Sequence, residues 1–169
     1  MEIIYKESND ADIPGMARLR EEHWGTEDYW QKRITAYLSG ELHPQQALAP
    51  RIAYVAAANN TMAGDTMAGD AIVGFIAGHL TRRFGCDGEL EWINVRADYR
   101  GREVSSQLLQ LLATWFKGQN ALSVCVNCAA DNTVAQNFYK RHGAVALSEH
   151  WLIWKDISVL LLNNSFPQR

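Results

Sequence analysis

The sequence has no hydrophobic run long enough to cross a membrane. Its longest apolar stretch lies near residues 71–78, whereas a bilayer-spanning helix needs about 20 apolar residues. The amino-terminal segment contains Glu2, Lys6 and Glu7 and has no apolar core of the kind found in signal peptides. We therefore expect a cytoplasmic protein with no membrane partner.

A strong excess of charge of one sign is also absent. The 169 residues include 16 Lys and Arg and 19 Asp and Glu, for a formal net charge of −3. Domains that bind nucleic acid usually present a basic surface, so this balance argues against a nucleic-acid partner. It is compatible with a neutral or cationic small substrate.

Cysteine is scarce: there are 3, an odd number that suits a reducing compartment. Cys125 and Cys128 form a CxxC pair, but a structural zinc site needs four ligands and no second pair accompanies them. A redox CxxC opens a helix, whereas this pair lies in a valine-rich stretch, residues 121–128, that we predict to be a buried strand. Because residues three apart on a strand point to opposite faces, we expect two buried structural cysteines and no metal site.

The composition is otherwise that of a globular domain, with 47% hydrophobic and 21% charged residues. The length fits one domain, residues 1–169, with a full core. Hydrophobic periodicity, caps and glycine stops predict strands at residues 2–7, 51–58, 71–81, 89–95, 121–128, 144–147 and 151–157. The same signals predict helices at residues 13–24, 26–40, 104–117 and 132–141, with a loop at residues 43–50.

These elements follow the order β-α-α-β-β-β-α-β-α-β-β. Consecutive strands with short connections form antiparallel pairs, whereas the strand–helix–strand unit over residues 89–128 requires a parallel crossover. We therefore predict a mixed α/β fold, with a mostly antiparallel sheet flanked by helices on both faces. The apolar run at residues 157–162 is a candidate strand for contact with a second copy in a homodimer.

The segment TMAGDTMAGD, residues 61–70, is a tandem repeat of the five residues TMAGD. It lies between two expected antiparallel strands, where a hairpin connection is needed. Two copies are too few for a repeat architecture, and the acids lack the spacing of a calcium loop. We interpret the segment as a tandem duplication at an exposed hairpin tip. Removal of residues 66–70 should leave folding and ligand binding nearly unchanged.

The stretch NVRADYRGREVSSQLL, residues 94–109, joins an expected strand to an expected helix through a tight turn. A helix amino terminus with free backbone N–H groups can bind an anion. Arg100 and Arg102 add positive charge there, and Ser105 and Ser106 add hydroxyl donors. The residues alone allow either a phosphate or carboxylate site or an ordinary connection with solvated arginines.

RGREVSSQLL resembles the Arg/Gln-x-x-Gly-x-Gly/Ala signature of the GCN5-related N-acetyltransferase (GNAT) superfamily, and the preceding INV is similar to its core strand. The run DNTVAQNFYKRHGA, residues 131–144, resembles the family's second motif, Asn-x-x-Ala-x-x-Phe-Tyr-x-x-x-Gly. VGFI, residues 73–76, is typical of its third strand. The element order agrees from Ile3 to about Ile157. The resemblance implies an enzyme that binds acetyl-CoA and acetylates an amine.

The resemblance also implies where acetyl-CoA binds. The pantetheine arm is expected along the backbone of Ile93, Asn94 and Val95, with Asn132 helping to hold it. Family members often have glycine where Glu103 and Ser105 stand, because glycine permits close backbone approach and positive φ. We expect the Glu103 carboxylate to point away from the phosphates. The pyrophosphate is expected on the backbone N–H groups of Arg102, Glu103, Val104, Ser105 and Ser106. Arg100 and Gly101 of the same loop are also expected to bind the cofactor.

Amine acetylation requires loss of a proton from the ammonium and stabilisation of the departing thiolate. Tyr139 matches the family tyrosine that donates a proton or a hydrogen bond to the departing thiolate. Glu89 matches a position where some members place a general base. Glu91 shares its face on a regular strand, as do Ile93 and Val95 if no bulge intervenes. Ordered water is the alternative base, and the two carboxylates could equally attract a cationic amine.

The acceptor is the least determined part of the hypothesis. We predict an acetyl-CoA-dependent N-acetyltransferase that acts on the primary amine of a small-molecule or amino-acid-like acceptor by direct attack in a ternary complex. The alternatives are a protein or peptide N-terminal acetyltransferase and a non-catalytic acyl-CoA-binding module. The regions that select the acceptor hold aromatics and acids that either suit a small cation or belong to the core: His23, Trp24, Glu27, Asp28, Tyr29, Trp30, His150, Trp151 and Trp154.

Overall fold

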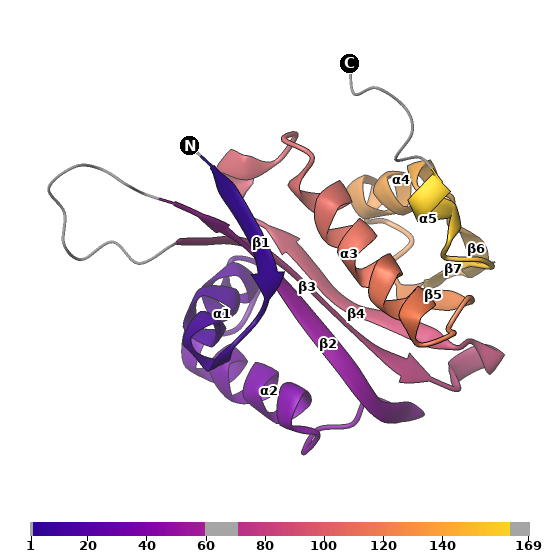
Figure 1. Cartoon of the computed structure of the whole chain (residues 1–169), viewed down its shortest axis with the longest axis horizontal. Coiled ribbons are helices and arrows are strands. Elements are labelled where there is room, and N and C mark those ends of the chain that lie inside the picture. The colour runs from indigo at the N-terminus through magenta and orange to yellow at the C-terminus, as the bar shows by residue number, and fades with distance from the viewer. Residues whose placement is uncertain (1, 60–70, 163–169) are drawn as a thin grey trace, which may run out of the picture.

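The computed structural model describes residues 2–59 and 71–162 (Figure 1), so the doubled TMAGD segment lies outside the described residues. Within them, 7 strands form one sheet in the order β1-β2-β3-β4-β5-β7-β6. The strands are β1 (Ile3–Glu7), β2 (Ala47–Ala58), β3 (Ala71–Thr81), β4 (Gly88–Val95), β5 (Val124–Asn127), β6 (Val145–Ser148) and β7 (Trp151–Trp154). The α-helices are α1 (Ile13–Glu21), α2 (Glu27–Ser39), α3 (Val104–Gly118), α4 (Thr133–Arg141) and α5 (Val159–Leu162).

Neighbouring strands of the sheet are antiparallel except β4 and β5, which are parallel. This arrangement confirms the predicted mixed, mostly antiparallel sheet. The parallel pair follows from the connection, since α3 carries the chain from the end of β4 back to the start of β5. Among the described residues, no helix is both long and apolar enough to span a bilayer.

Helices cover both faces of the sheet, as predicted (Figure 1). On one face, buried side chains of α1 and α2 pack against Phe75 and Trp92. On the other face, the apolar stripe of α3, with Leu108 and Leu112, packs against Ile76. Successive residues of β3 and β4 therefore face different helices, and this alternation decides where each polar side chain of β4 lies.

The ends of α2 and the start of α4 follow the expected capping chemistry. Thr26 caps α2 through a hydrogen bond from a backbone N–H to its side chain, and Gly40, at φ 83°, ends that helix. Asn132, predicted as the first helical residue, is the N-cap of α4. α3 extends one residue beyond the predicted 104–117, to Gly118, and Gln119 is its C-cap.

β2 begins at Ala47, inside the segment predicted to be a loop, residues 43–50. An irregularity separates its first pair, Ala47 with Thr81, from the regular pairing that begins at Arg51. The Arg51 guanidinium donates to carbonyl oxygens at the end of α2 and in the following loop, including that of Tyr37 at 2.7 Å. These bonds fix the carboxyl end of α2 against β2 and thereby position Tyr37.

The prediction of a strand at residues 157–162 was wrong. Asp156 Oδ1 accepts hydrogen bonds from the Ser158 backbone N–H at 2.9 Å and hydroxyl at 2.6 Å, which favours the helical turn that becomes α5. Leu160 is buried in the same core as α3. The strand on which the homodimer contact was predicted is therefore not formed by this segment.

β5 is shorter than the strand predicted over residues 121–128. Asp87 Oδ2 accepts hydrogen bonds from the backbone N–H groups of the two residues before β5, which removes these groups from the ladder. Cys125 and Cys128 are both buried, as predicted. Cys128 packs in the core on the α3 face, and strand alternation turns Cys125 to the opposite face.

Candidate active site

A cavity of about 540 Å³ opens where β4 separates from β5. The two strands pair only from Gly88 to Leu90 and from Val124 to Val126. From Glu91 onward the β5 side of β4 has no paired strand among the described residues. The volume suits a small-molecule site. The lining residues come from most parts of the fold: Arg20, Arg33, Pro44, Gln45, Arg83, Glu89, Leu90, Glu91, Trp92, Ile93, Val126, Asn127, Tyr139 and Trp151.

A β-bulge in β4 shapes the floor of this cavity. The regular pairing with β3 is interrupted between Leu90 and Trp92, which makes Glu91 an extra residue in the strand. Leu90 packs on the α3 face, whereas Trp92 packs on the face of α1 and α2. In a regular strand these two residues would share a face, so the bulge reverses the alternation at Glu91.

Because of the bulge, the Glu89 and Glu91 side chains do not share a face of the sheet with Ile93 and Val95. Glu89 and Glu91 both approach His79 of β3, at 2.7 and 4.0 Å. Ile93 and Val95 instead pack with the core on the α3 face. The prediction that all four share a face depended on a regular strand, and the bulge overturns it for Ile93 and Val95.

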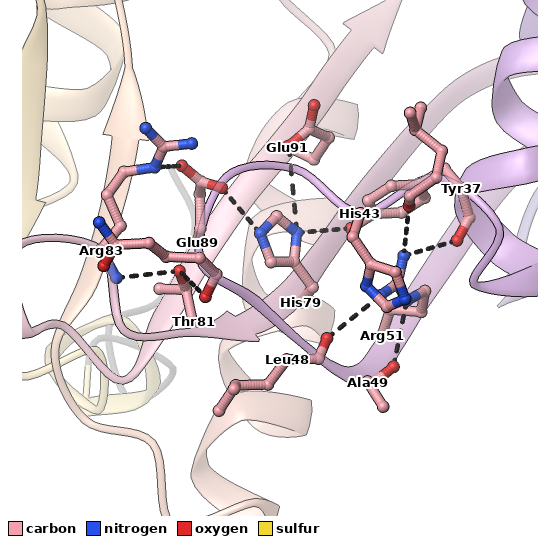
Figure 2. Close-up of polar contacts among 12 residues, drawn as sticks. Tyr37, His43, Leu48, Ala49, Arg51, His79, Thr81, Arg83, Glu89 and Glu91 are labelled. Atoms are coloured by element: carbon pink, nitrogen blue, oxygen red, sulfur yellow. Dashed lines mark hydrogen bonds and ion pairs between the residues drawn. The ribbon is translucent and has the colours of Figure 1, made fainter.

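A buried polar network holds Glu89 (Figure 2). His79, which is 0% exposed, lies with Nε2 at 2.7 Å from Glu89 Oε2. Its Nδ1 is 2.8 Å from the Tyr37 hydroxyl. Arg83 Nε lies 2.8 Å from the other carboxylate oxygen, Glu89 Oε1. Although neither ion pair meets the angular requirement of a hydrogen bond, both oxygens of Glu89 face a nitrogen. Glu89 is therefore the more restrained of the two carboxylates.

Glu91 is the less restrained carboxylate. Burial raises its pKa, and the negative charge of Glu89 raises it further, while His79, Arg33 and Arg83 act in the opposite direction. Its carboxylate lies 4.0 Å from His79 Nδ1, and that nitrogen is already hydrogen-bonded to the Tyr37 hydroxyl. A partly buried carboxyl with a raised pKa is suited to accept a proton near neutral pH.

His79, Glu89 and Glu91 also offer ligand atoms within 4.8 Å of one another, close enough to hold a metal ion. Two of these atoms face each other directly in the His79–Glu89 pair. Arg83 lies against the same carboxylate, and an adjacent guanidinium cation opposes the binding of a second cation. The network therefore fits an internal ion-pair cluster better than a metal centre.

Tyr139 of α4 lines the opposite side of the cavity. Its ring packs against Trp154, with centroids 5.6 Å apart and planes at 89°. Burial raises the pKa of Tyr139, and the Cys128 thiol adds to this, while Arg20 lowers it. No hydrogen bond links the Tyr139 hydroxyl to another described residue, so this protonated group is free to donate into the cavity.

The loop before α3 has the conformation of an anion site. Gly101 and Glu103 have φ values of 75° and 64°, both in the left-handed region. Within the described part of the chain, no hydrogen bond is donated by the backbone N–H groups of residues 102–106. These groups lie at the amino end of a 15-residue helix, where the dipole also favours negative charge. Glu103 is exposed, consistent with a carboxylate that points outward.

Several side chains expected at the cofactor are engaged within the protein. Arg100 Nε donates to the Val95 carbonyl at 3.2 Å, and Asn132 Oδ1 accepts from a backbone N–H of α4 at 3.2 Å. His142 Nδ1 lies 2.8 Å from a carbonyl oxygen, so it carries the proton. His142 Nε2 lies 3.0 Å from the Ser106 hydroxyl, so the two groups are hydrogen-bonded to each other. The backbone N–H groups remain available as donors, as do the Nη groups of Arg100 and the side-chain NH2 of Asn132, which these bonds do not use.

Arg20, Arg33, His79 and Arg83 line or support the cavity and were missed in the sequence. A histidine inside the apolar strand AIVGFIAGHLT was the one available signal. Of the aromatic and acidic residues proposed to select a cation, only Trp151 lines the cavity. Trp30 and Trp154 are core residues, and Trp24 and Tyr29 are exposed.

The fold resembles many solved acetyltransferases. A GNAT-family acetyltransferase from Desulfovibrio desulfuricans matches with a TM-score of 0.69 at 13% identity, covering 92% of this chain and 99% of that chain. The PaiA N-acetyltransferase of Thermoplasma acidophilum, solved with coenzyme A, matches with a TM-score of 0.65 at 15% identity over 92% and 99%. Ard1 of Thermoplasma volcanium gives 0.65 at 22% identity over 92% and 98%.

At these identities the likeness shows the fold. No curated protein matches the sequence. The sequence profile of the acetyltransferase (GNAT) family, however, matches residues 16–144, which is most of the chain and includes the loop before α3 and Tyr139. This protein therefore belongs to the GNAT family of acetyltransferases.

Proposed function

We propose that the protein transfers the acetyl group of acetyl-CoA to the primary amine of a small-molecule or amino-acid-like acceptor, by direct attack in a ternary complex. One domain, residues 1–169, carries the reaction. The observation behind this proposal is a single cavity that joins the unpaired part of β4, the free Tyr139 hydroxyl and the Glu91 carboxylate. The free N–H groups at the start of α3 are joined to the carboxyl end of that strand by a short connection that contains a 3-10 turn, Ala97–Tyr99.

The cofactor would bind mainly to backbone groups. Its pyrophosphate would lie on the N–H groups of residues 102–106, where the helix dipole favours anions. Its pantetheine arm would extend β4 along Ile93, Asn94 and Val95, in the manner of an added strand. Arg100 and Asn132 would support this binding from the two sides. The side chains of Arg100 and Asn132 already hold the ends of β4 and α4, which keeps both sides of the cofactor path fixed.

The chemistry assigns one proton transfer to each side of the cavity. Glu91 would accept a proton from the ammonium, and Glu89 would support it by raising its pKa. The free amine attacks the thioester carbonyl, the N–C bond forms, the attacking nitrogen releases its second proton to solvent, and the C–S bond breaks. Backbone N–H groups near Val95 would stabilise the oxyanion. The CoA thiolate leaves with a hydrogen bond or a proton from the Tyr139 hydroxyl.

The cysteines support direct transfer rather than an acetyl-enzyme. Cys86, Cys125 and Cys128 are buried. Burial raises the pKa of each of their thiols. A thiol must ionise to act as a nucleophile, so a raised pKa opposes this role.

Acetylation of a protein or peptide N terminus is the alternative activity. Its support is that folds similar to this chain include Ard1 of Thermoplasma volcanium and a NatC complex bound to a peptide and CoA. A non-catalytic acyl-CoA-binding module is a second alternative, suggested by Glu103 in place of the family glycine. The free hydroxyl of Tyr139 and the poised carboxylate of Glu91 favour turnover over this module.

Calorimetry with acetyl-CoA followed by a CoA thiol-release assay tests the proposal. The assay should use small amines, free amino acids and short peptides as acceptors. We expect acetyl-CoA to bind and CoA to be released with a small amine or amino acid. Binding without release on any acceptor would favour the module, release with peptides alone would favour the alternative enzyme, and no binding would reject all three.

A further inference from the structure

The cavity contains more positive charge than amine acetylation requires. Three arginines and two glutamates line it: Arg20, Arg33, Arg83, Glu89 and Glu91. Arg83 is paired with Glu89 at 2.8 Å. Arg20 and Arg33 therefore remain opposite a single available carboxylate, that of Glu91. A cavity for a simple amine needs the carboxylate but not the two arginines.

Arg20 lies at the end of α1 in an unusual environment for a charged group. Its guanidinium stacks 4.4 Å from the centre of the Trp30 ring, and Nη1 donates to Asn94 Oδ1 at 3.1 Å. Its Nε is buried and has no hydrogen-bond partner in the described part of the chain. Burial lowers the pKa of Arg20, and Glu91 partly offsets this. Arg20 also lines the cavity, and an anion beside a largely buried guanidinium stabilises its charge.

Arg33 of α2 adds a second cation from the other helix. Among the described residues it forms no hydrogen bond or close ion pair. Its neighbour Lys32, in contrast, is exposed and pairs with Asp28 at 3.1 Å. Arg20, Arg33 and Glu91 line the same cavity, and the positive charge of Arg33 lowers the pKa of both of the other groups. Arg20 and Arg33 repel each other, and an anion between them would remove this repulsion.

We propose that the acetyl acceptor is a small zwitterion, an amine with a carboxylate in the same molecule. Its amine lies at Glu91, and its carboxylate lies between Arg20 and Arg33. A guanidinium presents parallel N–H groups that match a planar carboxylate. This assignment rests on the proposed acetyl transfer and narrows its acceptor to free amino acids and compact relatives. A peptide acceptor lacks this carboxylate, because the α-carboxyl group of its first residue is part of a peptide bond.

Paired acceptors test the assignment: free amino acids, their carboxamides, and the matching amines that lack a carboxyl group. We expect kcat/KM for the free acids to exceed that for the carboxamides by at least about tenfold, because a charge-assisted contact is lost in the amide. Arg33→Gln should lower kcat/KM for the acids by about ten- to a hundredfold and change the carboxamides within about twofold. Lys32→Gln, on the same helix but outside the cavity, is the matched control and should change neither.

The outcomes separate this inference from the acetyl transfer on which it rests. Acids and carboxamides acetylated equally well by the wild type, or reduced equally by Arg33→Gln, would overturn the zwitterion while leaving an acetyltransferase. An equal loss on both acceptors would show that Arg33 acts only through Glu91. If acetyl-CoA does not bind or no amine releases CoA, the proposed acetyl transfer itself fails. Thermal unfolding of Arg33→Gln and Lys32→Gln checks that both variants fold.

Discussion

The proposed cofactor site before α3 and the proposed acceptor cavity use different kinds of chemical groups. Before α3, the available groups are backbone N–H donors of five consecutive residues, presented by a loop with two left-handed residues. At the other end, charged side chains from α1, α2, β4 and the turn before β4 converge on one cavity. Backbone recognition depends on local conformation, whereas side-chain recognition depends on how distant segments pack. We therefore expect the first end to govern cofactor affinity and the second to govern acceptor choice and proton transfer.

The largest expected effect comes from Glu91→Gln at the side-chain end. Loss of the proposed base should lower kcat by about 10²- to 10⁴-fold, with acetyl-CoA affinity unchanged by calorimetry. Exposed Glu22→Gln is the matched control and should retain full activity. A kcat within threefold of the wild type would assign the proton to water or to another group.

Glu91→Gln also makes a prediction about stability. The pKa of Glu91 is raised in the folded protein, so its ionised form opposes folding at pH values above the unfolded pKa of about 4.3. Glutamine removes this penalty. The variant should therefore unfold at the same or a higher temperature than the wild type at pH 8, and the difference should vanish toward pH 4. A less stable variant at pH 8 would contradict the raised pKa.

Tyr139→Phe should give the next largest effect. The hydroxyl has no hydrogen bond with a described residue, so its removal should cost little stability. The departing thiolate would lose a donor, which should lower kcat by about ten- to a hundredfold with little change in acetyl-CoA affinity. Rapid-quench or steady-state measurement of CoA release provides the test. An unchanged kcat would show that the Tyr139 hydroxyl has no role in the reaction and that the residue contributes only to packing.

Glu89→Gln tests how the two carboxylates interact. The charge of Glu89 raises the pKa of Glu91, so its removal should lower that pKa. The acidic limb of kcat/KM against pH reports deprotonation of the base, and it should therefore move to lower pH. A shift of this limb to higher pH, or none, would contradict the assignment of Glu91 as the base. Arg83 remains as a cation beside the new amide and lowers the pKa of Glu91, which favours the same direction.

Glu103→Gly should give the smallest effect and should act only at the backbone end. Glycine relieves the left-handed backbone at φ 64° and removes a negative charge beside the expected phosphates. Acetyl-CoA should bind about two- to tenfold more tightly, more so at low salt. The acidic limb of the pH profile should not move. Glu103→Asn, which also tolerates this backbone region, separates the two causes because it removes the charge and keeps a side chain.

The same contrast explains what the sequence could predict. The order of the predicted elements, the mixed sheet and the turn that joins β4 to α3 were confirmed, because they depend on local periodicity and on a short motif. The α5 helix was missed because the Asp156 turn and the burial of Leu160 override an apolar run that suits a strand. The convergence of Arg20 and Arg33 on Glu91 is tertiary, and neither arginine lies in a recognisable pattern.

The β4 bulge shows the same limit in a single strand. The spacing of Glu89 and Glu91 suggested one shared face with Ile93 and Val95, and this is correct only for a regular strand. One extra residue reverses the alternation and brings both carboxylates to His79. Nothing in the letters GELEWINV marks the bulge. The catalytic roles of Tyr139, Glu89 and Glu91 and the cofactor contacts remain predictions.

Initial-rate kinetics with both substrates varied test the central claim most directly. Direct attack in a ternary complex predicts intersecting double-reciprocal lines for acetyl-CoA and the best acceptor. It also predicts no release of CoA when acetyl-CoA is incubated with the enzyme alone. Parallel lines together with a stoichiometric burst of CoA in the absence of acceptor would reveal an acetyl-enzyme and would contradict the account.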